Sequence, residues 1–359
     1  MEDGGRAWEF PAELICFLRH GVIRPHMPAC PAISVLMPVR DAQESVVAAV
    51  ESVLVQSCED WELVIVDDGS RDATWPLLES LAAEDKRVVL LRQEARGIVA
   101  ALQRGCASCR GEFIARMDAD DVMDAHRLAK QRAFLVEEPH CGLVSCRVRF
   151  GGNAVGYAEH VRWVNSLMTH EAMSLRRFVE SPVAHPSVMF RRELLARHGG
   201  YREGDFPEDY ELWLRWLEAG VRFGKVEAEL LTWNDPPQRL SRTDARYSIE
   251  AFHTMKCAYV RRWLEQHVQG RDLWLWGAGR VTRRRFAALA DQIRGYIDVD
   301  EAKRGLRYAG RAVRMADELP QREESFILAG VCARGARENI HAHLTQRGWI
   351  EGRDFLLAA

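Results

Sequence analysis

The sequence predicts an α/β protein with a mainly parallel, Rossmann-like sheet, followed by a small C-terminal unit that is also α/β and Rossmann-like. From Ile33 onward, short apolar runs alternate with longer stretches of helical spacing, which is typical of βαβ units. After Gly270 the pattern starts again, with an apolar run that leads into Gly277-Ala278-Gly279. The length of 359 residues also favours two compact units over one.

The first part of the chain supplies strands and helices in strict alternation. A further strand is expected at 141–149 and a helix at 208–219. Between them, up to about Pro207, the chain looks irregular and rich in Trp, Met and His, which we interpret as a lid over a binding site. The other expected strands are 33–37, 63–66, 88–91 and 113–117, and the expected helices are 42–56, 73–84 and 98–109.

Four parts are expected along the chain. They are an N-terminal arm (1–31), the main α/β domain (32–245), a connecting helix (246–270) and the C-terminal domain (271–359). In the C-terminal domain, Gly277-Ala278-Gly279 is followed about twenty residues later by Ile297-Asp298, which echoes a dinucleotide-binding unit. The third glycine is missing, so a structural or RNA-contacting module is the favoured interpretation.

Composition narrows the class of protein. Charges interrupt every apolar run before it reaches the roughly 18 residues of a membrane span. The N-terminus opens acidic and lacks the basic start and apolar stretch of a secretory signal. Nine cysteines at scattered spacings indicate reduced thiols rather than a disulfide framework. We therefore expect a cytoplasmic protein without a membrane span.

Acidic side chains follow three of the expected strands. Asp41 comes after the first strand, Asp67 and Asp68 after the second, and Asp118-Ala119-Asp120-Asp121 after the fourth. The carboxyl ends of parallel strands meet at one edge of an open sheet, where ligands bind. Because carboxylates gathered at one edge repel one another, a cation or a polar ligand is expected to compensate their charge.

Asp118 and Asp120 are the expected ligands of that cation. In an extended chain, residues two apart point to the same side, so both carboxylates can face one ion. Mg²⁺ or Mn²⁺ held by one or two carboxylates, with phosphate oxygens and water completing the shell, is the usual arrangement for a diphosphate leaving group. A solvated turn is the alternative, and the position at a strand end favours the metal site.

Two further carboxylates have a structural and a functional interpretation. Asp68 precedes a Gly-Ser turn and can either cap the next helix or accept the imide N–H of a nucleotide base. Asp209 lies in the first turn of the helix expected from Glu208. It is either a residue that the helix dipole stabilises or a general base for an attacking hydroxyl.

Four segments in this order resemble the family 2 inverting glycosyltransferases. They are Ile33–Pro38, Val66–Ser70, Gly111–Asp121 and Glu208–Arg215. The resemblance covers about residues 32–245 and implies a GT-A fold, a nucleoside-diphosphate sugar donor, UDP in the first place, and a divalent metal ion. It also implies a role for each matching residue: Asp68 at the base, Asp120 on the metal, Asp118 near the ribose or diphosphate, and Asp209 as the general base.

The same resemblance extends the donor site. It adds Pro38, Asp41 and Gly97, although Arg40-Asp41 stands where the family often has Tyr-Asn or Arg-Asn. The segment 233–242 resembles a flexible loop that closes over the donor. Its Arg239 and Arg242 could neutralise phosphate charge, with solvation at the surface as the alternative.

On the acceptor side, the resemblance points to His185, Glu208 and Trp213. His185 precedes a proline and could equally be a structural turn residue. The acceptor itself is left open by these residues.

The sequence therefore predicts a metal-dependent glycosyltransferase that moves galactose, N-acetylglucosamine or a similar sugar to an acceptor hydroxyl. The acceptor is a glycan, a lipid-linked saccharide or tRNA. The tRNA alternative comes from a looser resemblance over most of the chain, through Ser145–Arg149, Arg162–Asn165 and the Gly-Ala-Gly tail. These segments resemble the queuosine-tRNA galactosyltransferases, also described as β-1,3-N-acetylglucosaminyltransferase-like proteins. Arg283, Arg284 and Arg285 offer a basic patch for RNA, or else a solvated helix face. A non-catalytic protein that binds nucleotide sugars or RNA is the alternative of another class.

Overall fold

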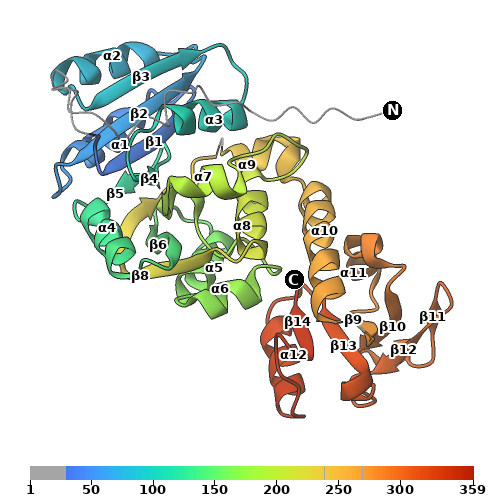
Figure 1. Cartoon of the computed structure of the whole chain (residues 1–359). Helices are drawn as coiled ribbons and strands as arrows, with labels where there is room; N and C mark the ends of the chain where they lie inside the picture. The colour runs from blue at the N-terminus through green and yellow to red at the C-terminus, as the bar shows by residue number, and fades with distance from the viewer. Residues whose placement is uncertain (1–29, 238, 269) are drawn as a thin grey trace, which may run out of the picture. The chain divides into compact units, whose positions relative to one another are not determined.

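Two sheets organise the chain (Figure 1). The computed structural model describes residues 30–237, 239–268 and 270–359, so nearly all of the predicted arm lies outside the described residues. Residues 31–359 belong to one compact unit, in which helix α10 (Ile249–His267) follows the first sheet along the chain and precedes the second. The division of this unit into domains at residues 245 and 271 stays a prediction.

The first sheet has eight strands in the order β3-β2-β1-β4-β7-β6-β8-β5. β1 is parallel to both β2 and β4, and β2 is parallel to β3, as the alternating pattern predicts. The other half is mixed, because β7 is antiparallel to β4 and β6, and β5 is antiparallel to β8. The strands are β1 (Ile33–Val39), β2 (Trp61–Asp68), β3 (Val88–Gln93), β4 (Phe113–Arg116), β5 (Val122–Met123), β6 (Cys141–Phe150), β7 (Met189–Arg191) and β8 (Arg222–Trp233).

Helices cover both faces of this sheet, because successive residues of a strand point to opposite sides. Val35 and Met37 of β1 pack in the same core cluster as α1, whereas Leu36 between them packs with α3. Longer helices turn an apolar stripe inward, as Val46, Val50 and Val53 do in α1. The helices of this part are α1 (Val46–Leu54), α2 (Thr74–Glu84), α3 (Ile98–Ser108), α4 (Arg127–Glu137), α5 (Val155–Ser166), α6 (His170–Arg176), α7 (Glu193–His198), α8 (Glu208–Glu218) and α9 (Leu240–Thr243).

The middle of the chain is more regular than the sequence suggested. Residues 150–207 were expected to be irregular, but they form α5, α6 and α7 and place β7 between β4 and β6. These elements were missed because most of them are short: β7 has three residues and α7 has six. Hydrophobic periodicity needs a longer window to be recognised. The long strand β8 was also missed, although Val226-Glu227-Ala228-Glu229 shows the alternation of a half-buried strand.

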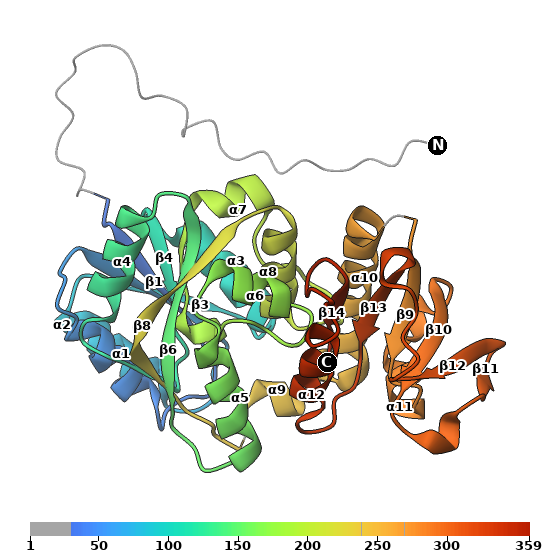
Figure 2. The ribbon, with the colours of Figure 1, turned by 90° about the horizontal axis from the view of Figure 1, so that it is seen from below.

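The second sheet has the order β11-β12-β10-β9-β13-β14, which Figure 2 shows directly. Apart from the antiparallel β11, its strands are parallel, and their order is that of a Rossmann unit with β9 as the first strand. The elements are β9 (Asp272–Trp276), α11 (Arg280–Arg285), β10 (Ile293–Asp298), β11 (Arg307–Tyr308), β12 (Arg311–Met315), β13 (Ser325–Ala329), α12 (Ala336–Thr345) and β14 (Phe355–Leu357).

Asp298, from the same C-terminal unit, holds the glycine turn Gly277-Ala278-Gly279 that follows β9. Oδ2 of Asp298, at the end of β10, accepts a hydrogen bond from the backbone N–H of Ala278 at 2.8 Å, and Nζ of Lys303 lies 3.0 Å from the same oxygen. In a dinucleotide site an acid at this position is free to bind a ribose. Here Asp298 is engaged by Ala278 and Lys303 instead, which supports the interpretation of this unit as a structural module.

Two expectations from composition can be checked against the described part of the chain. Within residues 30–237, 239–268 and 270–359, no helix is long and apolar enough to cross a membrane. The cysteines in these ranges are free thiols.

Candidate active site

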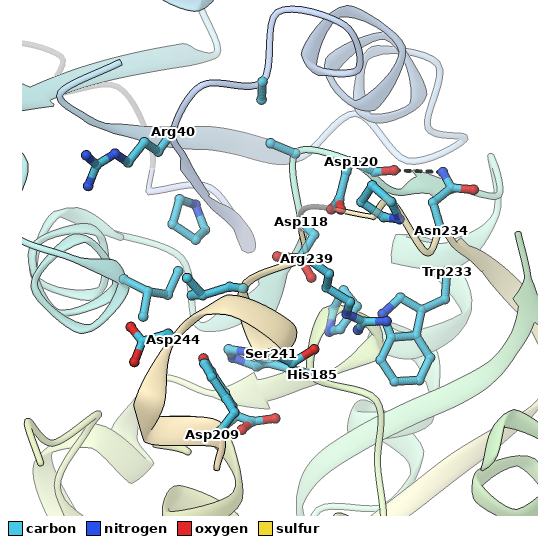
Figure 3. A pocket seen from close by; sticks show the side chains of 18 of the residues that line it. Arg40, Asp118, Asp120, His185, Asp209, Trp233, Asn234, Arg239, Ser241 and Asp244 are labelled. Atoms are coloured by element: carbon cyan, nitrogen blue, oxygen red, sulfur yellow. Dashed lines mark hydrogen bonds between the residues drawn. The ribbon is translucent and has the colours of Figure 1, made fainter. Parts of the chain in front are cut away.

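A pocket of about 1610 Å³ lies where β1, β2 and β4 end (Figure 3). It exceeds the roughly 300–1,000 Å³ of a typical small-molecule site, which leaves room for two ligands side by side. The predicted convergence of the acidic strand ends is therefore observed. The predicted site residues that line the pocket are Pro38, Asp41, Asp68, Gly97, Asp118, Asp120, His185, Glu208, Asp209 and Arg239.

Asp118 and Asp120 line this pocket and form an acidic cluster with the buried Asp121. Each offers a carboxylate oxygen, and the three oxygens lie within 4.8 Å of one another. Burial and the neighbouring charge of Asp118 raise the pKa of Asp120 to about 6, and burial raises the pKa of Asp121 well above its usual range. Asp121 is 1% exposed, and its Oδ2 has no hydrogen-bond partner among the described residues. Such oxygen donors fit a hard divalent cation, Mn²⁺ or Mg²⁺.

A turn, and not an extended strand, brings these carboxylates together. β4 ends at Arg116, and the backbone N–H of Asp121 donates to the carbonyl of Asp118 at 3.4 Å. Asn234 holds the turn from the end of β8, donating from its backbone to Oδ1 of Asp121 at 2.8 Å and from Nδ2 to the carbonyl of Asp120 at 2.7 Å (Figure 3). The argument from alternating side chains therefore missed Asp121, although the run of three acids in four residues contained the signal.

Asp118 is also paired within the protein. One of its oxygens contacts Nη1 of Arg116, whose side chain is buried. Asp120 has no such cationic partner recorded within the described residues. This difference agrees with the expectation that Asp120 is the principal metal ligand, which remains a prediction.

Asp68 shapes the loop between β3 and α3. Its Oδ1 accepts hydrogen bonds from Nε2 of Gln93 and the backbone N–H of Arg96, and its Oδ2 accepts one from the backbone N–H of Gly97, each at 2.8 Å. Gly97 has φ of +93°, which glycine adopts without strain. A carboxylate has about four acceptor positions, so one stays available for a ligand. The contact of Asp68 with a nucleotide base stays a prediction.

Asp41 joins the ends of β1 and β2. Its backbone N–H donates to Oγ of Ser70 at 3.0 Å, and its Oδ1 accepts from the backbone N–H of Arg71 at 2.8 Å. The residue has φ of +48°, a conformation that aspartate tolerates better than most residues. Asp41 thus fixes the rim of the pocket as well as lining it.

Glu208 and Asp209 are the first two residues of α8, and both line the pocket. Glu208 is buried and accepts a hydrogen bond from the hydroxyl of Tyr247. Asp209 is half-buried, and its Oδ1 accepts from the backbone N–H of Tyr210 at 2.7 Å. Burial raises the pKa of Asp209 to about 6, and burial together with the charge of Asp209 raises the pKa of Glu208 to about 7. Asp209 is the carboxylate of the two with an oxygen left for a ligand.

His185 and Trp213 differ in their access to the pocket. His185 lines it, with Nε2 at 2.7 Å from the hydroxyl of Tyr201, and burial lowers its pKa well below the usual range, so it is neutral at neutral pH. Trp213 is 0% exposed and packs against Trp216 and Phe223. The expectation that Trp213 faces the acceptor is corrected, because α8 is enclosed by core residues one turn beyond Asp209.

Arg239 and Arg242 differ in the same way. The guanidinium of Arg239 lies 4.7 Å from the ring centroid of Tyr157 and 4.6 Å from that of Trp233, inside the pocket. Arg242 is 41% exposed, lies outside the pocket lining, and pairs with Asp235 at 2.7 Å. The phosphate-binding role of both arginines stays a prediction, and Arg239 is the one of the two that lines the pocket. Tyr157, His160, Glu180 and Tyr247 line the pocket without having been predicted, since distant segments carry them.

An α/β chain with acidic strand ends around one pocket is the architecture of nucleotide-sugar enzymes, and comparison with known proteins gives the family. The model of "Glycosyl transferase family 2" matches residues 34–199. A relative from Bacillus subtilis (strain 168), named "Putative glycosyltransferase EpsE", is 30% identical over 229 residues. The match covers 62% of this chain and 80% of EpsE. The O-antigen biosynthesis glycosyltransferase WbnJ of Escherichia coli is 26% identical over 237 residues, 65% of this chain and 89% of WbnJ.

The chain belongs to glycosyl transferase family 2 and is a glycosyltransferase with a GT-A fold. A solved structure with a similar fold is the mannosyltransferase PcManGT from Pyrobaculum calidifontis in complex with GDP-Man and Mn²⁺. Its TM-score is 0.52 at 21% identity, and the match covers 65% of each chain, just under two thirds. This likeness concerns the fold alone.

Proposed function

We propose that the protein is a metal-dependent, inverting glycosyltransferase that uses a nucleoside-diphosphate sugar, with a UDP-sugar as the first candidate. The observation that carries the proposal is that one pocket holds Asp118 and Asp120, which cluster with the buried Asp121, and the separate carboxylate of Asp209. The mannosyltransferase of similar fold was solved with a nucleoside-diphosphate sugar and Mn²⁺, which supports the donor class. Galactose and N-acetylglucosamine remain the candidate sugars.

Asp120 and Asp118, together with Asp121, would hold the metal ion. When bound, Mn²⁺ or Mg²⁺ neutralises the negative charge that develops on the departing diphosphate. The orphaned Oδ2 of Asp121 and the raised pKa of Asp120 are the features that such an ion would relieve. Asp68, Gly97, Pro38 and Asp41 lie on the donor side of the same pocket.

Asp209 acts as the general base in this proposal. Its Oδ1 is fixed by the backbone N–H of Tyr210, so Oδ2 is the oxygen that accepts the proton of the attacking hydroxyl. An attack that inverts the anomeric carbon needs the base and the leaving group on opposite sides of the sugar. Asp209 comes from α8 and the acidic cluster from the turn after β4, so two different elements supply the two groups.

The acceptor that we propose is a hydroxyl of a glycan or of a lipid-linked saccharide. Relatives named for O-antigen biosynthesis support this class. The tRNA alternative offered Arg283, Arg284 and Arg285 as its RNA-binding patch, and these arginines have partners within the protein. Arg283 lies 3.8 Å over the ring of Tyr308, Arg284 pairs with Glu250, and Arg285 contacts Cys332. We expect no tRNA shift in a low-salt gel assay, and a shift lost on changing these arginines to alanine would restore the tRNA alternative.

A thermal-shift screen of nucleotide sugars tests the proposal. A ligand that binds the folded state raises Tm in proportion to its affinity and concentration. We expect at least one nucleoside-diphosphate sugar to raise Tm with Mn²⁺ present and to lose most of this effect after chelation. No shift with any donor would contradict the proposal. A shift without any turnover would favour a non-catalytic binding protein.

A further inference from the structure

The side chain of Arg239 packs against two aromatic rings that contact each other. Its guanidinium lies 4.7 Å from the ring centroid of Tyr157, on α5, and 4.6 Å from that of Trp233, at the end of β8. The two rings contact each other edge to face, with centroids 5.1 Å apart and an interplanar angle of 65°. Figure 3 shows the Arg239 side chain between Asp118 and the ring of Trp233.

Little else fixes this guanidinium. Arg239 is 17% exposed, and its Nη1 is buried without a hydrogen-bond acceptor in the described ranges. The nearest recorded carboxylate, Asp235, lies 3.6 Å away, which is beyond a hydrogen bond, and it is already paired with Arg242. The N–H groups of Arg239 are thus oriented by stacking and are left with donor capacity.

The two rings limit where those N–H groups can point. A guanidinium is planar, and packing it against rings on one side leaves the N–H donors on its other side unshielded. Arg239, Asp118 and Asp120 all line the pocket, and Figure 3 shows Arg239 beside Asp118. The N–H groups of Arg239 and the acidic cluster therefore share the region of the pocket in which a diphosphate would meet the metal ion.

We propose that Tyr157 and Trp233 are positioning residues that hold Arg239 as a preformed ligand for the diphosphate of the donor. The inference rests on the proposed donor class and adds to it the two residues that orient the phosphate-binding arginine. A flexible arginine loses side-chain freedom when it binds phosphate, whereas an arginine already packed against two rings has lost that freedom beforehand. The two rings consequently act on donor affinity through Arg239.

A double-mutant cycle on the full chain tests this coupling. The measurement is the Kd of UDP in the presence of Mn²⁺, by titration calorimetry, for Tyr157→Leu, Trp233→Leu, Arg239→Ala and the two double variants. We expect each ring substitution to weaken binding at least fivefold in the wild-type background. In the Arg239→Ala background we expect the same substitutions to change Kd less than twofold, because the group that they position is gone.

A matched control separates this effect from a general loss of packing. Phe150→Leu removes a ring that packs 5.5 Å from Tyr157 in the same cluster and does not line the pocket. This variant should leave the Kd of UDP within twofold of wild type. Should Trp233→Leu fail to fold by circular dichroism, Tyr157→Leu carries the test, since Tyr157 is only half-buried.

The outcomes distinguish this inference from the proposed function. Ring substitutions that weaken UDP binding equally with and without Arg239, or that have no effect in the wild-type background, would overturn the positioning role while leaving the donor class intact. A wild-type protein that binds no nucleoside diphosphate at all would overturn the proposed function itself.

Discussion

The hydroxyl of Tyr247 lies 2.7 Å from Oε2 and 2.9 Å from Oε1 of Glu208. This contact joins the segment after β8 to the first turn of α8, beside Asp209. Because Glu208 is engaged in this way, Asp209 is the neighbouring carboxylate that can serve an incoming hydroxyl. The assignment of the general base therefore depends on a contact between residues far apart in the sequence.

Replacing Tyr247 by phenylalanine should destabilise the protein. Glu208 would stay buried without its donor, and an unsatisfied buried polar group costs about 1–3 kcal/mol. Urea unfolding measures the loss. Tyr259→Phe is a matched control, since the Tyr259 hydroxyl donates to Glu211 on the same helix, outside the pocket lining. Both variants should lose stability, but Tyr247→Phe alone should slow donor turnover, and equal turnover in the two would contradict the role given to the contact.

Glu208 should make stability depend on pH. Its pKa in the folded protein is about 7, above the unfolded value of about 4.3, so the folded state binds more protons between these values. The free energy of unfolding should therefore fall as pH rises through this window, by about 4 kcal/mol at most from this residue. Chemical denaturation at pH 5 and pH 8 measures the fall. Glu208→Gln should flatten it, and an equally steep fall in the variant would argue against this source.

The catalytic rate should show an acid limb. A general base must be deprotonated, and burial raises the pKa of Asp209 to about 6, so kcat should fall tenfold per pH unit below that value. Steady-state rates from pH 4.5 to 8 provide the measurement. If the limb instead reported loss of the metal ion, raising the Mn²⁺ concentration would move it to lower pH, so a limb that does not move supports Asp209.

Asp118 and Asp120 should respond differently to substitution by asparagine. Asp120→Asn should weaken Mn²⁺ binding and lower kcat at least a hundredfold, with little change in stability. Asp118→Asn should also lower the free energy of unfolding, by about 1–3 kcal/mol, because buried Arg116 loses its charged partner. Electron paramagnetic resonance of bound Mn²⁺ and urea unfolding measure the two effects. If the two variants lost Mn²⁺ equally and had equal stability, the proposed difference between Asp118 and Asp120 would be contradicted.

The part of the fold from β1 to β4 was predictable because its sequence signals are local. Apolar runs such as Leu63–Val66 end in acidic turns, and parallel pairing then brings Asp68 and Asp120 to one edge. The remainder depends on contacts between distant segments. Nothing near Tyr157 indicates that it meets Arg239, and Trp213 gives no local sign that its helix is enclosed by core. The spacing of Arg239 and Arg242 in the sequence likewise could not show which of the two lines the pocket.

The measurement that tests the central claim most directly is nucleoside-diphosphate release from the donor found in the thermal-shift screen. It is made for the wild type with Mn²⁺, for the wild type after chelation, and for Asp209→Asn with Mn²⁺. A metal-dependent transferase with Asp209 as its base requires release by the wild type, loss after chelation, and a rate at least a hundredfold lower in the variant while donor affinity is kept. Release that survives chelation, or a variant that works near the wild-type rate, would contradict the claim.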